Sequence, residues 1–155
     1  HNWDMKNLVR DLNGKIPYIT PGKVVTHIGV AGNLRHFEEV NAMIRERAGS
    51  TGVHFGEYPK GLKGRDKSEA KYISLALAKC HLVDGLFKTD ADEVRRGFEY
   101  WSNLEKIYWD TERPYPHRLV FEDMVVLYDL ALKKGMKLKL NTPFIPRSVL
   151  EHGYW

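Results

Sequence analysis

The sequence predicts an α+β fold in which helices flank a curved, barrel-like sheet. Two stretches have the composition of strands. The run 23–30 (KVVTHIGV) is rich in β-branched residues and is bounded by glycines. The run 72–83 (YISLALAKCHLV) alternates large apolar residues with smaller ones. No G-x-G-x-x-G motif follows either run, so a mixed, barrel-like sheet is favoured over a doubly wound parallel sheet.

The predicted helices are indicated by apolar residues at helical spacing and by capping residues. Asn33 precedes the stretch 34–47 as a cap, and Asp90 lies three residues before Glu93 at the start of the stretch 89–105. The lysine-rich end of the stretch 122–134 is typical of a helix C-terminus. Residues 4–12 and 147–152 are also predicted to be helical, and residues 118–121 and 136–140 are predicted to form short strands.

The composition is that of one compact domain. The chain has 155 residues, 43% of them hydrophobic, and we expect a single domain spanning residues 1–155. Apolar runs stay well short of a membrane span, and the N-terminal stretch lacks a signal pattern. The single cysteine, Cys80, excludes an internal disulfide framework and a cysteine-based zinc site. These observations predict a cytoplasmic protein without a metal or other cofactor.

A basic, glycine-rich stretch spans residues 50–65. Lys60, Lys63 and Arg65 lie among its glycines, and the net charge of the chain is +4, which favours an anionic partner, nucleic acid first. The stretch is either a solvated flexible loop or a loop that follows a phosphate backbone. It lacks the G-x-x-x-x-G-K-[ST] motif, so it is not a nucleotide-binding P-loop.

An aromatic and charged segment, residues 106–122 (KIYWDTERPYPHRLVFE), is too rich in such side chains for a passive connection. Arg113 and Arg118 flank two prolines that fix the backbone, so both can be aimed at a phosphate or a base edge. His117 with Glu122 is conceivable as a metal-free nuclease centre. No H-E-x-x-H motif supports a zinc hydrolase.

The same segment, together with the N-terminal pair Asn2-Trp3 and the stretch 16–18, resembles the EVE and YTH domains of the PUA-like superfamily. This resemblance implies a small barrel with a pocket for a flipped, modified base. YTH domains recognise methylated adenine in RNA, and EVE-like domains occur in modification-dependent restriction systems of the McrB type. The resemblance implies pocket roles for six residues, Asn2, Trp3, Tyr18, Phe87, Trp101 and Trp109. The phosphate contacts would come from Lys60, Lys63, Arg65, Arg113 and Arg118.

The expected function is therefore non-enzymatic recognition of a modified base, with N6-methyladenine in DNA favoured over RNA. Such a domain has no output of its own, so we expect it to be fused or bound to a motor or nuclease component. Two other functions stay open. One is a protein-interaction module that uses the aromatic residues, and the other is a small nuclease that uses His117.

Overall fold

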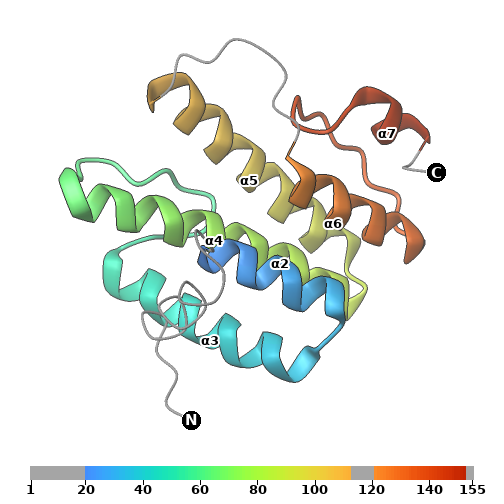
Figure 1. The fold of residues 1–155 in the computed structure, drawn as a ribbon, viewed down its shortest axis with the longest axis horizontal. Coiled ribbons are helices and arrows are strands. Elements are labelled where there is room, and N and C mark those ends of the chain that lie inside the picture. Colours follow the sequence, from blue (N-terminus) through green and yellow to red (C-terminus); the bar gives the residue numbers. More distant parts are fainter. Residues whose placement is uncertain (1–19, 113–120, 153–155) are drawn as a thin grey trace. The chain divides into compact units, whose positions relative to one another are not determined.

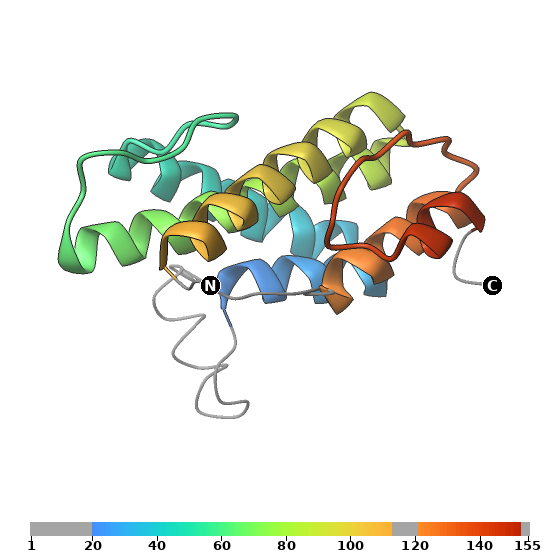
Figure 2. The same cartoon turned by 90° about the horizontal axis from the view of Figure 1, so that it is seen from above.

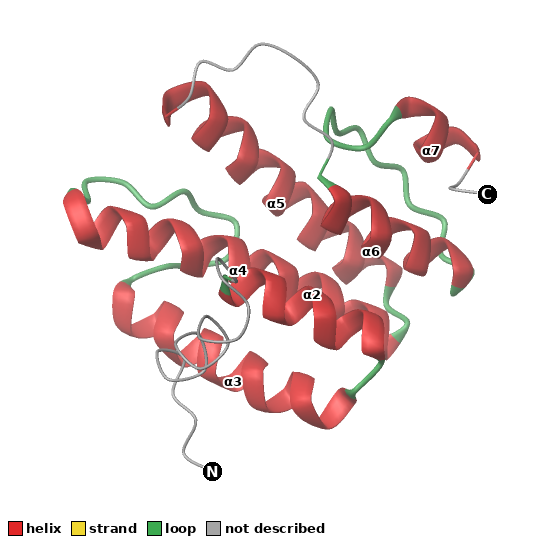
Figure 3. Cartoon of the chain, in the orientation of Figure 1, coloured by secondary structure: helices red, strands yellow, loops and turns green. Residues whose placement is uncertain are grey.

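The computed structural model describes residues 20–112 and 121–152, apart from the side chains of Arg65, of residues 109–112 and of His152. Within these ranges every regular element is a helix and no strand occurs (Figure 1 and Figure 3). The helices are α2 (Pro21–Ala31), α3 (Leu34–Thr51), α4 (Gly64–Lys88), α5 (Ala91–Glu112), α6 (Glu122–Lys133) and α7 (Arg147–His152). The prediction of an α+β fold is wrong, and so is the resemblance to the EVE and YTH domains, because a PUA-like domain requires a β-barrel.

The chain divides into two compact units, His1–Cys80 and His81–Trp155. Helix α4 is continuous across the boundary, so it contributes its first part to one unit and its last two turns to the other. The expectation of one domain over residues 1–155 stays a prediction. In the described part of the chain, no helix combines the length and the apolar character needed to cross a membrane.

Helix α2 occupies the stretch 23–30 that was predicted as a strand. Its start is encoded locally, since the Thr20 hydroxyl accepts a hydrogen bond from the Lys23 amide and Pro21 occupies the first turn. Its end is encoded by Gly32, whose φ of +69° favours glycine. The β-branched residues Val24 and Val25 are buried. Their preference for strands led to the wrong prediction. In the structure, burial on one face of the helix overrides that preference.

Helix α3 confirms the helix predicted over residues 34–47 and forms a helical hairpin with α2 (Figure 1). The Asn33 carboxamide accepts a hydrogen bond of 3.1 Å from the His36 amide, as expected of a cap. Phe37 and Ile44 are almost fully buried in this unit. The helix runs four residues beyond the predicted end and stops at Gly52, which has a φ of +72°.

Helix α4 replaces the second predicted strand, residues 72–83. Most of its side chains from Ala70 to Leu86 are buried, including Ile73 and Leu77. A helix that is buried nearly all round has no polar face, so its apolar pattern loses the 3.6-residue period. The remaining alternation of large and small residues resembled the period of a strand.

Unit His81–Trp155 begins with a close approach of α4 and α5. A Cβ on Gly97 would lie 2.7 Å from the Leu82 backbone nitrogen, and a Cβ on Gly85 would lie 2.7 Å from a Val94 methyl carbon. The Asp90 carboxylate accepts a hydrogen bond from the Glu93 amide at 3.2 Å, which confirms the predicted start of this helix. The helices predicted over residues 122–134 and 147–152 are confirmed as α6 and α7.

The segment between α6 and α7 returns along the same unit without forming a strand (Figure 2). The prediction of a strand over residues 136–140 is therefore wrong, although burial does alternate there. The segment is held by a buried hydrogen bond of 2.7 Å between the Thr142 and Ser102 hydroxyls. The Tyr128 hydroxyl donates to the Leu150 carbonyl at 3.0 Å and so fastens α7 to α6. The predicted helix 4–12 lies outside the described residues, and so does the predicted strand 118–121 except for Phe121, which caps α6.

Candidate functional site

The basic loop, which we define as residues 52–63, connects α3 to α4. It starts from a fixed point, because Val53 is buried and its amide donates to the Ala48 carbonyl at 2.8 Å. The loop then turns at two glycines in the left-handed region, Gly56 and Gly61, which have φ values of +86° and +75°. A residue with a side chain is strained at such positions, so the glycines determine where the loop turns.

Lys60 and Lys63 are both exposed, and each stands immediately before a glycine with positive φ, Gly61 and Gly64 respectively. Within the described residues, neither ammonium group has a hydrogen-bond or ion-pair partner. Both charges are therefore presented to solvent, where an incoming phosphate can reach them.

Acidic residues near the loop are partly neutralised by the protein itself. Glu69, in the second turn of α4, pairs with Arg47 of α3. Asp66 lies in the first turn of α4, where the helix dipole stabilises a negative charge. An apolar side chain accompanies the lysines in the loop, since Leu62 is 36% exposed. The surface combines cations with apolar contact area, as single-stranded nucleic acid requires.

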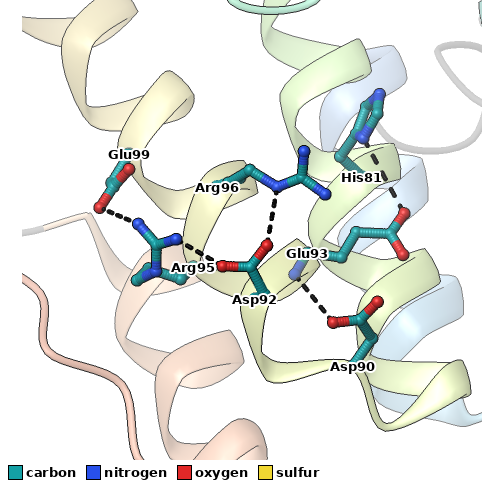
Figure 4. Close-up of polar contacts among 7 residues, drawn as sticks. All are labelled: His81, Asp90, Asp92, Glu93, Arg95, Arg96 and Glu99. Carbon is teal, nitrogen blue, oxygen red and sulfur yellow. Dashed lines mark hydrogen bonds and ion pairs between the residues drawn. The ribbon is translucent and has the colours of Figure 1, made fainter.

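A second polar cluster lies where α4 turns into α5 (Figure 4). The Glu93 side chain, 13% exposed, faces Nδ1 of His81 at 3.9 Å. Burial, together with a hydrogen bond and repulsion from the Asp84 carboxyl, raises the pKa of Glu93 to about 7, and Lys88 opposes this shift. The cluster therefore holds a carboxyl that changes its protonation near neutral pH.

The other polar contacts drawn in Figure 4 are ion pairs between side chains exposed on the surface. Arg95 contacts Asp92 at 2.5 Å and Glu99 at 2.9 Å, and Arg96 contacts Asp92 at 3.3 Å. All four side chains are at least one-third exposed, so these pairs contribute little to stability. Across residues 20–112 and 121–152, no three His, Cys, Asp or Glu side chains are grouped so that they could hold a metal ion.

Of the six residues predicted for a base pocket, the structure describes the side chains of two, Trp101 and Phe87. Trp101 is 2% exposed and stacks on Phe98 in the core, with ring centroids 6.5 Å apart, so it offers no face to an external base. Phe87 is half-buried on α4. The remaining predicted pocket residues lie outside the description, namely Asn2, Trp3, Tyr18 and the side chain of Trp109.

The predicted phosphate contacts divide in a similar way. Lys60 and Lys63 are brought together on the basic loop, and Arg65 stands in the first turn of α4 with its side chain outside the description. Arg113, Arg118 and the nuclease candidate His117 lie outside the described residues.

Sequence reasoning missed a second basic stretch, which begins at the end of α6. Its signal was available, because no Asp or Glu occurs between Asp129 and Glu151.

Comparisons with known proteins give no family for this chain: no family model, no curated protein and no solved structure matches it.

Proposed function

We propose that this chain binds nucleic acid without catalysing a reaction on it, and that the basic loop contacts the phosphate backbone. The observation that carries the proposal is the pair Lys60 and Lys63, exposed and without a partner in the described structure. Recognition of a modified base in a barrel pocket is not part of the proposal, because it depended on the overturned PUA-like fold. We also propose a cytoplasmic setting, which suits a chain whose single cysteine, Cys80, is buried.

The energetic basis is the release of counterions. Each lysine that neutralises one phosphate adds about 0.9 to the magnitude of the slope of log K against log salt for duplex DNA, and about 0.7 for a single strand. Removing both Lys60 and Lys63 should therefore reduce the slope by roughly 1.8 or 1.4, respectively. Backbone contacts carry no sequence information, so the loss should be similar for different sequences.

Fluorescence polarisation with labelled DNA and RNA, single-stranded and duplex, tests the proposal over a range of salt concentrations. The variant Lys60→Ala/Lys63→Ala is compared with Lys23→Ala/Arg35→Ala, which removes the same charge from exposed positions on α2 and α3. We expect the loop variant to lose slope and affinity and the control to retain both. Absence of binding by the wild type at low salt, or equal losses in both variants, would contradict the proposal.

The nuclease alternative is tested with the same oligonucleotides. The wild type and His117→Ala are incubated with them, with and without a divalent metal, and the products are separated on a gel. We expect the oligonucleotides to remain intact. Cleavage that disappears in the His117→Ala variant would replace the proposed function by a nuclease activity.

A further inference from the structure

The most asymmetric charge distribution in the chain lies in unit His81–Trp155, from residue 130 to residue 150. These 21 positions contain five basic residues and no acidic one, whereas the whole chain has a net charge of only +4. The five are Lys133, Lys134, Lys137, Lys139 and Arg147, and all of them are exposed.

Two of these charges are compensated within the chain. Lys133 pairs with Asp129 at 2.9 Å, and Arg147 pairs with Glu151 at 2.7 Å. The ammonium groups of the other three, Lys134, Lys137 and Lys139, have no hydrogen-bond or ion-pair partner among the described residues. We call residues 134–139 the lysine segment.

The backbone of the lysine segment is held in place at its start. Gly135 has a φ of +81°, and its amide donates to the Leu132 carbonyl at 2.9 Å. The Met136 amide donates to the Ala131 carbonyl at 3.1 Å, which completes the C-terminal cap of α6. The segment therefore leaves the helix in a defined direction.

Alternate burial then determines which way the lysines point. Met136 and Leu138 are 5% and 9% exposed, whereas Lys137 and Lys139 are exposed. This two-residue period places the two lysines on the same outer face, about 6.6 Å apart if the chain is extended. That spacing is of the same order as the separation of successive phosphates along a nucleic-acid strand.

The far end of the segment is also fixed, so little ordering remains to be done on binding. Thr142 is tied to Ser102 of α5, and its hydroxyl accepts a hydrogen bond from the Phe144 amide at 3.3 Å. The Phe121 amide donates to the Phe144 carbonyl at 3.2 Å, and the two rings meet edge to face at 4.8 Å. Preorganisation of this kind reduces the entropy lost when a partner binds.

From this arrangement we infer that the lysine segment is a second contact surface for the phosphate backbone of a nucleic-acid strand. The inference rests on the proposed function for the class of partner, but it concerns a different surface.

A membrane is disfavoured, because binding in the headgroup region requires apolar side chains that face outward. Here Met136 and Leu138 face inward, and none of the exposed large apolar side chains of the described residues lies in the segment.

The test compares three forms of the full chain by fluorescence polarisation with labelled single-stranded DNA and RNA. They are the wild type, the segment variant Lys134→Gln/Lys137→Gln/Lys139→Gln and the loop variant Lys60→Ala/Lys63→Ala. If each lysine neutralises one phosphate, the segment variant loses about 2 from the salt slope, which corresponds to roughly a 50-fold weaker affinity at 0.15 M salt.

A charge-matched control distinguishes the loss of a local contact surface from a general effect of lower net charge. Lys88→Gln/Arg96→Gln/Lys106→Gln removes the same three charges from α4 and α5 of the same unit, and all three positions are exposed. We expect this control to bind almost as the wild type does, and arginine at all three segment positions to preserve binding. Circular dichroism of every variant checks that the helices are retained.

The outcomes separate the two proposals. If the wild type binds no nucleic acid, the proposed function and this inference both fail. If the loop variant is weakened and the segment variant equals the wild type, only this inference fails. If the segment variant alone is weakened, the inference stands and the assignment of the basic loop fails. Equal weakening of the segment variant and its control would overturn the inference. A segment variant that retained nucleic-acid binding but lost binding to phosphatidylserine vesicles or polyglutamate would overturn it as well.

Discussion

The buried carboxyl of Glu93 makes the stability of the chain depend on pH in a way that one substitution can remove. Its pKa is raised to about 7 from the ordinary 4.5, first by burial and then by the Asp84 carboxyl that shares a hydrogen bond with it. The folded chain therefore keeps a proton on Glu93 at pH values where the unfolded chain has released it. Stability from this group is fully present below about pH 4.5 and is lost as the pH rises through about 7.

The magnitude follows from the two pKa values. At 1.36 kcal/mol for each unit, the difference between about 7 and 4.5 corresponds to roughly 3 kcal/mol, most of which falls between pH 5 and 8. The Glu93 side chain is only 13% exposed, so solvent screening removes little of this effect. Glu93→Gln copies the protonated carboxyl and keeps a donor for Asp84. We therefore expect the free energy of unfolding of the variant, relative to that of the wild type, to rise by roughly 2–3 kcal/mol from pH 5 to pH 8.

Urea denaturation followed by circular dichroism at four pH values over this range measures the difference. Glu99→Gln is the matched control, because Glu99 lies on the same helix, is 49% exposed and pairs with Arg95 at the surface. Its effect should stay within about 0.5 kcal/mol at every pH. His81 faces the same carboxyl, so the comparison is repeated in a His81→Asn background, where the same pH-dependent difference is expected. A Glu93→Gln variant whose stability changes with pH as the wild type's does would refute the assignment.

Four further predictions concern the helices and their packing and are checked by urea or thermal unfolding. Gly97→Ala should destabilise the chain by about 1–3 kcal/mol, because its Cβ would lie 2.7 Å from the Leu82 backbone nitrogen. Gly49→Ala, with no atom within 4 Å of its Cβ, should instead stabilise α3 by up to about 1 kcal/mol; destabilisation by both would point to a general effect of alanine. Trp101→Ala should remove about 3–5 kcal/mol, and a loss below about 1 kcal/mol would contradict its place in the core. Asn33→Ala should remove about 1 kcal/mol with the cap of α3, and an unchanged midpoint would contradict that cap.

The sequence predicted those helices whose patterns are local. Residues 34–47, 89–105 and 122–134 have a polar face, an apolar face and a cap, and each of these stretches forms a helix in the structure. Helix α4 has no polar face over residues 73–83, so its pattern could not distinguish a buried helix from a strand. Its length was the available evidence, since twelve residues exceed the usual length of a strand.

The error in α2 has a different origin. Thr20, Pro21 and Gly32 are helix start and stop signals, and they outweigh the β-branched residues between them because they act on the backbone directly. With both long strands lost, the barrel and its aromatic pocket are lost too. The position of Trp101 in the core could not be derived from the sequence, because an aromatic residue at the correct helical spacing serves the core or a pocket equally well.

Charge was the more dependable sequence signal for a surface, and the reason is physical. Lysine is almost never fully buried without a partner, so its exposure is expected whatever fold the chain adopts. Lys60 and Lys63, which were selected for their charge in a glycine-rich stretch, are exposed although the predicted fold was wrong. The same argument applies to Lys134, Lys137 and Lys139, where the absence of acidic residues from 130 to 150 can be seen in the sequence alone. What the sequence could not provide is the common direction of Lys137 and Lys139, because this depends on the burial of Met136 and Leu138.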